Sequence, residues 1–513
     1  MSKVLKATIG LMLITMVSKI LGFSRELVLG AVYGVSTISD VYITAMNIPT
    51  VLFTSVGVAL ATTFIPLYYE NLELGGKEKA TKFTNNIINI VLIISIIMSL
   101  LCFLFADQIV KIFAIGFKGN TLSMAVKFTK IMIFSGIFIG INHIMTSLLQ
   151  VKGKYVIPGF IGIPYNIIII CSIIFSDDKY IYILPIGTLV AILSQFVFQY
   201  FFVKKDGFKY YFVFDLKDEY VKKMVLLILP VFIGVAVNQI NALIDRTIAS
   251  TLVEGSISAL NYANRLNSFV IGLFISTLSA VIYPTLAKIS FNDKEKFISS
   301  ISTSVNWVII LIVPIAIGAI VLSEPIVRIL FQRGAFDTIA TKMTSTALLF
   351  YSIGMIGFAI REILNKVFYS LQDTKTPMLN GIIAVVLNII LNIILSKIMG
   401  YAGLALATSI SAIVCILLLF KSLENKIGYF RQDKIKIVFL KSLISGIIMG
   451  VITKISFYYL VKITSSELLS LIVSIIIGML IYGILGIVMK NEEISLLIIK
   501  IKEKLRIRKF KIE

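Results

Sequence analysis

Fourteen stretches of this chain are apolar for long enough to cross a lipid bilayer. They begin near residues 7, 38, 85, 127, 156, 181, 222, 256, 298, 339, 378, 401, 437 and 468. A helix needs about 20 apolar residues to span the hydrocarbon core, and the 513-residue chain is 58% hydrophobic and only 15% charged. The pattern predicts an all-α polytopic membrane protein with about fourteen transmembrane helices, and it excludes an ordinary soluble fold.

Lysine and arginine alternate with the predicted spans. If the amino terminus is cytoplasmic, the cytoplasmic segments hold 32 of these residues and the outward loops hold 10. Basic residues accumulate on the cytoplasmic side of membrane proteins, so we expect both termini in the cytoplasm. The net charge of +21 is spread between apolar runs, which indicates a membrane protein with no nucleic-acid partner. Residues 491–513 predict a basic cytoplasmic tail, either solvated or lying on the anionic leaflet.

Other function classes are disfavoured by composition and by loop length. Three cysteines and one histidine are too few for a zinc site or a disulfide framework. A membrane-embedded glycosyltransferase or polymerase normally needs a catalytic acid on a sizeable outward loop, and every outward loop here is short. We therefore expect a protein that is not an enzyme and requires no cofactor.

The chain repeats itself at an almost constant spacing. The segment from Ile38 to Pro66 resembles that from Ile257 to Pro284, and the Asn-Ile-Ile triplet at Asn166 recurs at Asn388, with offsets of 219 and 222 residues. Six spans per copy make the repeats parallel, as in many transporters. The predicted organisation is two six-helix lobes, residues 1–210 and 211–425, related by pseudo-two-fold symmetry, with two further helices in 426–490.

Several charges fall within the predicted spans, where each costs about 2.5 to 3.5 kcal/mol. Arg25 with Glu26, Asp245 with Arg246 and Arg361 with Glu362 are adjacent opposite charges, which form structural ion pairs, reach toward an interface, or line a cavity. Lys19 and Arg265 lack an adjacent acid. These two are better candidates for contact with water or with an anionic ligand such as a pyrophosphate headgroup.

Oxygen-bearing side chains also gather near the end of the repeat. Asn388 and Asn392 are one helical turn apart, and Thr408 lies on the next span. With Asp245 they could supply oxygen ligands to a monovalent cation, although such amides more often hydrogen-bond neighbouring helices.

Five sequence motifs now give the chain a family resemblance. They are residues 18–26 (SKILGFSRE), 238–245 (NQINALID), 254–266 (EGSISALNYANRL), 330–337 (LFQRGAFD) and 371–377 (LQDTKTP). The chain resembles the MurJ/MviN family of lipid II flippases, within the multidrug/oligosaccharidyl-lipid/polysaccharide exporter superfamily. The resemblance implies outward movement of the undecaprenyl-pyrophosphate-linked peptidoglycan precursor across the bacterial cell membrane by alternating access. Alternatives are a flippase for another polyprenyl-linked oligosaccharide, or a multidrug exporter of the same superfamily.

The resemblance also implies roles for individual residues. The implied central cavity that binds substrate is lined by Lys19, Arg25, Glu26, Asp40, Arg265 and Arg361. Sodium is the one candidate ion, and its implied ligands are Asp245, Asn388, Asn392, the carbonyl of Leu404 and Thr408. Some members have an acid at the position of Asn392. Residues 426–490 correspond to a groove for the lipid tail, and the implied partners are lipid II, membrane lipids and other cell-wall synthesis proteins.

Overall fold

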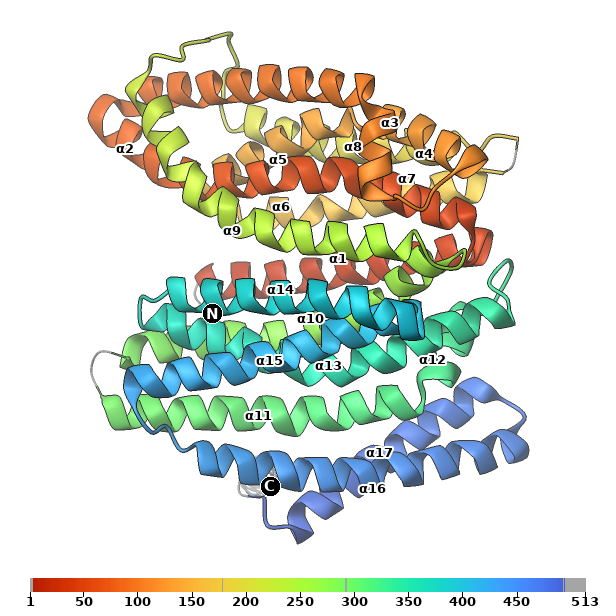
Figure 1. Ribbon diagram of the computed structural model, residues 1–513. Helices are drawn as coiled ribbons and strands as arrows, with labels where there is room; N and C mark the ends of the chain where they lie inside the picture. The colour runs from red at the N-terminus through yellow and green to blue at the C-terminus, as the bar shows by residue number, and fades with distance from the viewer. Residues whose placement is uncertain (1–2, 178, 291–292, 492, 494–513) are drawn as a thin grey trace, which may run out of the picture. The chain divides into compact units, whose positions relative to one another are not determined.

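The computed structural model describes residues 3–177, 179–290, 293–491 and 493 (Figure 1). Every regular element in this part of the chain is a helix, which confirms the predicted all-α class. The described residues divide into two compact units, one formed by residues 1–261 with 333–337 and the other by 262–332 with 338–513. Most of the predicted tail 491–513 lies outside the described residues.

Unit 1 contains a long helix that is interrupted by two glycines. Helix α2 breaks at Gly75 and Gly76, the second of which has a φ of 67°, a conformation that favours glycine. Its two arms begin near the predicted span starts at 38 and 85. The helices are α1 (Lys3–Tyr33), α2 (Thr37–Leu104), α3 (Ala106–Phe113), α4 (Gly119–Met132), α5 (Ser135–Val151), α6 (Val156–Phe160), α7 (Gly162–Phe175), α8 (Ile183–Lys205) and α9 (Glu219–Ala249).

Unit 2 holds most of α10 and all later helices. Its core is aliphatic and joins α11, α13 and α15 to α16 through side chains such as Val305, Ile363 and Leu419, all fully buried. Helices α11 and α16 run side by side (Figure 1). The helices are α10 (Ser256–Ile289), α11 (Lys294–Val321), α12 (Ser323–Phe331), α13 (Thr338–Ser370), α14 (Lys375–Met399), α15 (Tyr401–Ile427), α16 (Gln432–Thr464) and α17 (Glu467–Val488).

The lengths and hydropathies of the helices are those of a multi-pass membrane protein. Among the described residues, nine helices are long and apolar enough to cross a bilayer, or ten if the pair α4 and α5, bent by 41°, forms one span. Helix α2 counts once here although it has two arms. The predicted total of about fourteen is compatible with these helices.

Two short helices occupy equivalent places in the two repeats. Helix α3 directly follows the second arm of α2, and α12 directly follows α11. Each has an acid in its first turn and a base in its last, and the acid contacts the base, with Asp107 2.5 Å from Lys111 and Glu324 3.8 Å from Arg328. The two pairs are 217 residues apart, which agrees with the offset found in the sequence.

Candidate functional site

The charges at the centre of α1 form a buried network. A terminal nitrogen of Arg25 lies 2.6 Å from Glu26 Oε1, and the two residues are 9% and 2% exposed. The other terminal nitrogen donates to Asn166 Oδ1 on α7 at 3.3 Å, and the guanidinium lies 5.6 Å from the ring centroid of Tyr165. Glu26 accepts a further bond from Asn261 at 3.0 Å. The contacts to Glu26 and Asn166 engage two of the five donors of the guanidinium and fix its orientation.

Three other predicted residues have less buried surroundings. Lys19 on α1 and Arg265 on α10 are exposed, as expected for side chains that meet water or a ligand, and Asp245 on α9 is half-buried. Lys19 and Asp245 belong to unit 1, whereas Arg265 belongs to unit 2.

Asp40 has a defined role at the start of a helix. Its carboxylate is 5% exposed and accepts the backbone N–H groups of Gly255 at 2.9 Å and Ser258 at 2.7 Å, which belong to the first turn of α10 and its approach. The arrangement is reciprocal, since Glu254 accepts the backbone N–H of Thr37 at the start of α2 at 3.0 Å. Each acid therefore compensates the positive end of the other helix.

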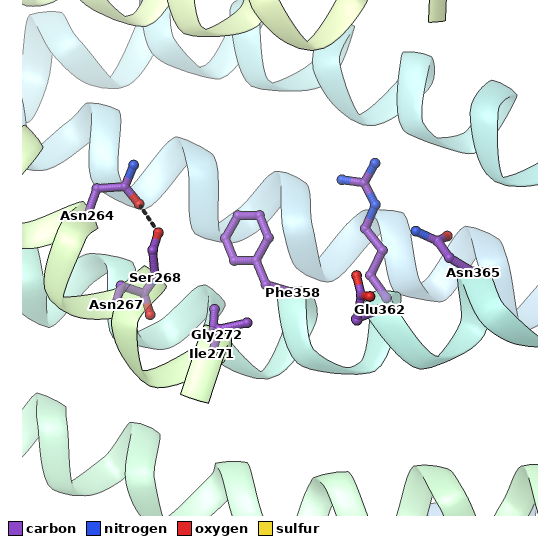
Figure 2. A pocket seen from close by; sticks show the side chains of 9 residues that line it. Asn264, Asn267, Ser268, Ile271, Gly272, Phe358, Glu362 and Asn365 are labelled. Atoms are coloured by element: carbon purple, nitrogen blue, oxygen red, sulfur yellow. Dashed lines mark hydrogen bonds between the residues drawn. The ribbon is translucent and has the colours of Figure 1, made fainter. Parts of the chain in front are cut away.

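A polar pocket of about 470 Å³ lies between α10 and α13 within unit 2. Figure 2 shows Asn264 and Ser268 of α10 on one side of Phe358, and Glu362 and Asn365 of α13 on the other. The pocket is lined by Asn264, Asn267, Ser268, Ile271, Gly272, Phe358, Arg361, Glu362 and Asn365. Amides, a hydroxyl, a guanidinium and a carboxylate together suit a ligand that carries both phosphate and sugar hydroxyls.

The pocket contains one predicted residue, Arg361, and several that the sequence did not single out. Ser268 donates to Asn264 Oδ1 at 3.4 Å, and Glu362 lies 3.8 Å from Lys366 one turn further along α13. The available signal was spacing, because Asn264 and Ser268, like Arg361 and Asn365, are four residues apart on helices and so share a face.

Four of the five proposed sodium ligands come together in unit 2. Asn392 donates to Asn388 Oδ1 at 3.0 Å, Asn388 donates to Thr408 at 3.4 Å, and Thr408 donates to the carbonyl of Leu404 at 3.0 Å. Asp245 belongs to the other unit. The four are neutral oxygen donors, a set that fits a monovalent cation. Within the described residues there is no cluster of three or more His, Cys, Asp or Glu side chains that could hold a metal.

Comparison with known proteins identifies the family. Residues 29–488 match the family model for lipid II flippase MurJ. The chain belongs to the MurJ family. It is 31% identical to the probable lipid II flippase MurJ of Haemophilus influenzae over 460 residues, covering 85% of this chain and 89% of the relative. It is 33% identical over 431 residues to that of Buchnera aphidicola subsp. Baizongia pistaciae, covering 82% and 83%.

Solved structures agree with this assignment. A lipid II flippase MurJ in an inward closed conformation is 31% identical, with a TM-score of 0.82 over 94% of this chain and 99% of that one. An inward-facing multidrug resistance MATE transporter of the MOP superfamily shares the fold at 14% identity, with a TM-score of 0.66 over 83% of this chain and 99% of that one. MurJ membership confirms the family predicted from the motifs. It makes the chain a multi-pass transporter of the bacterial inner membrane rather than an enzyme.

Proposed function

We propose that this protein moves lipid II, the undecaprenyl-pyrophosphate-linked peptidoglycan precursor, from the inner to the outer leaflet of the inner membrane. The observation that carries the proposal is the match to the MurJ family model over residues 29–488. The polar pocket between α10 and α13 supports it, because a purely apolar cargo would gain nothing from the amides and charges there. Peptidoglycan synthesis, and with it cell shape, would depend on this step.

The headgroup is proposed to be recognised by the cationic side chains of the spans. Arg25 is held by Glu26 and Asn166 in one orientation, so little side-chain entropy is lost when it meets a phosphate. Lys19 and Arg265 are exposed and supply further positive charge. Arg361 brings a guanidinium to a pocket whose amides can bind sugar or peptide groups. Transport by alternating access then requires only that these contacts differ between two conformations.

We propose a separate place for the polyprenyl tail. A cavity of about 790 Å³ in unit 2 is bordered by α11, α13, α15 and α16, and its wall is largely isoleucine and phenylalanine. Its rim carries Lys421, Glu424, Asp433 and Lys436. This cavity adjoins the first of the two helices predicted to form a lipid-tail groove, and part of the tail would fit there by burying apolar surface.

Sodium, orientation and partners complete the proposal. A sodium ion would be held by Asn388, Asn392, Thr408, the Leu404 carbonyl and Asp245, and it would supply a positive charge whose binding biases one conformation. Both termini are proposed to be cytoplasmic, since 32 basic residues fall on that side against 10 on the other. Other cell-wall synthesis proteins, which make and consume lipid II, are proposed as partners.

Depletion of the protein in its own cells tests the function directly. Cells that carry the wild-type gene should keep lipid II accessible in the outer leaflet, whereas cells with Arg265→Ala should accumulate it in the inner leaflet. Lys397→Ala is the matched control, because Lys397 is also an exposed base on a membrane helix but lies at the end of α14. Normal outer-leaflet lipid II in depleted cells would refute the proposal, and rescue by Arg265→Lys would show that charge is what matters.

A further inference from the structure

The segment that joins α8 to α9 presents a row of large apolar side chains to its surroundings. Five of them are exposed by 41% to 70% of their surface, namely Tyr210, Tyr211, Phe212, Phe214 and Leu216. We call residues 207–217 the aromatic loop. The loop connects two predicted spans, so lipid tails do not surround it along its length. Contiguous apolar exposure of this kind marks an interaction surface.

Three buried asparagines hold the loop against α2. Asn85 donates to the carbonyl of Lys209 at 3.0 Å, and Asn89 donates to that of Val213 at 2.9 Å. Asn86 donates to the carbonyl of Asp215 at 2.8 Å and accepts its N–H at 2.8 Å. The three asparagines are 0% to 1% exposed, so these bonds are protected from water and the loop has a fixed position.

The order of these contacts gives the course of the loop. The second arm of α2 runs from the Gly75–Gly76 break into the membrane, so Asn89 lies one helical turn deeper than Asn85, or about 6 Å. The loop meets Asn85 first, then Asn89, and returns to Asn86. The hydroxyl of Tyr210 also donates to Asn89, at 2.6 Å. The loop therefore dips toward the bilayer and comes back.

The bonding of the backbone fits that depth. Irregular backbone is tolerated at the edge of the hydrocarbon only where its polar groups have partners. The asparagines give partners to three carbonyls of the loop and to one N–H. A loop surrounded by water would not need buried side chains for this purpose.

The charges around the loop point the same way. Lys204, Lys205, Lys209 and Lys217 are exposed. The nearby acids are turned inward, with Asp215 accepting the N–H of Lys217 and Asp218 capping α9 through the N–H of Tyr220. Outward-facing charge beside the aromatic rings is thus basic, which matches anionic phospholipid headgroups.

We propose that the aromatic loop anchors the protein in the headgroup region of the leaflet on its side, with its rings inserted and the lysines on anionic phospholipid. Aromatic side chains prefer this region of a bilayer. Under the orientation proposed above, this is the inner leaflet, from which the cargo is taken. The anchor itself requires no particular cargo.

Tryptophan fluorescence can test the proposal, because the chain has a single native tryptophan. Phe212→Trp protein is reconstituted into vesicles of phosphatidylethanolamine and phosphatidylglycerol, and its signal is corrected by that of the parent, so that Trp307 stays in place in both. The new tryptophan should emit at shorter wavelength than one in water. Acyl chains brominated near the headgroup should quench it more than chains brominated near their ends.

Two matched variants set the scale of the quenching. Lys77→Trp, beside the break in α2, should be quenched by aqueous iodide, and Ile94→Trp, on an exposed face of α2, by the deep bromines. If iodide quenches Phe212→Trp as strongly as Lys77→Trp and lipid bromines do not, the proposal is wrong. Asn89→Ala in the Phe212→Trp protein should shift quenching from lipid toward iodide. None of these readouts depends on transport, so a wrong cargo assignment would leave them unchanged.

Discussion

The carboxylate of Asp40, in the first turn of α2, accepts a 2.7 Å hydrogen bond from the backbone N–H of Ser258, in the first turn of α10. Two positions that correspond to each other in the repeated sequence are thereby joined directly. The bond gives Asp40 a structural role in addition to the substrate contact expected from the family.

Loss of this cap should lower stability. Asp40→Ala removes the acceptor of two buried N–H groups, and we expect the free energy of unfolding to fall by about 1 to 2 kcal/mol. The midpoint of thermal unfolding in detergent measures this. Asp40→Asn, which keeps one acceptor oxygen, should lose less. An unchanged midpoint in Asp40→Ala would contradict the assignment.

Removal of Glu26 should cost more than removal of the whole Arg25–Glu26 pair. Both side chains are nearly inaccessible, so Glu26→Gln leaves a buried guanidinium without its counter-charge, at a cost of about 3 to 5 kcal/mol. The double variant Arg25→Gln with Glu26→Gln should recover much of that loss. Thermal unfolding of the single and double variants gives the coupling. Additive losses would show that the two charges do not interact.

Acid should weaken the contact between Asp373 and Lys426, which lies outside the spans. Partial burial raises the pKa of Asp373, but hydrogen bonds from Lys426, at 2.5 Å, and from Thr376 outweigh it and lower the pKa from 3.8 to about 2. Because the folded-state pKa is depressed, the stabilisation is complete above pH 3.8 and is lost as the pH falls through about 2.

Unfolding between pH 5 and pH 2 should therefore become easier in the wild type, and the change should be smaller in Asp373→Asn. Thermal unfolding at a series of pH values measures the slope. Glu467→Gln controls for the general effect of removing an acid. Equal slopes in Asp373→Asn and the wild type would contradict the pKa shift.

A carboxylate at position 392 should strengthen sodium binding. Asn392 is fully buried beside Asn388, so Asn392→Asp adds a charge next to the proposed ligands. We expect about a tenfold gain in sodium affinity, equivalent to roughly 1.4 kcal/mol. The rise in unfolding temperature with sodium chloride, compared with choline chloride, reports it. Asn380→Asp, another buried asparagine on α14, is the control, and an equal sodium response in both variants would contradict the site.

Apolar runs and motifs predicted the architecture well because membrane helices announce themselves by length and hydropathy. The sequence also explains one family motif in structural terms. In residues 371–377, Gln372 has a φ of 57° and Asp373 accepts the N–H of Thr376 at 2.9 Å, so the motif ends one helix and begins the next. The helices α3 and α12 were missed because eight or nine amphipathic residues are too few to be recognised as a span.

Side-chain partners were harder to predict. Adjacency in sequence suggested that Arg25 pairs with Glu26, and it does, but Glu362 contacts Lys366 instead of being described with Arg361. Neighbours on a helix point about 100° apart, so which of them meet depends on the packing around them. The asparagines Asn85, Asn86 and Asn89 were visible in the sequence, yet their partners lie more than a hundred residues away.

The matching ion pairs of α3 and α12 bear on the history of the chain. Two short helices with the same polarity, in the same place and 217 residues apart, are most simply inherited from one ancestor. The elbow that each forms after a membrane helix was then already present in a half-length protein, before its gene was doubled. The two terminal helices, α16 and α17, have no counterpart in the first copy and joined the lineage as a separate acquisition.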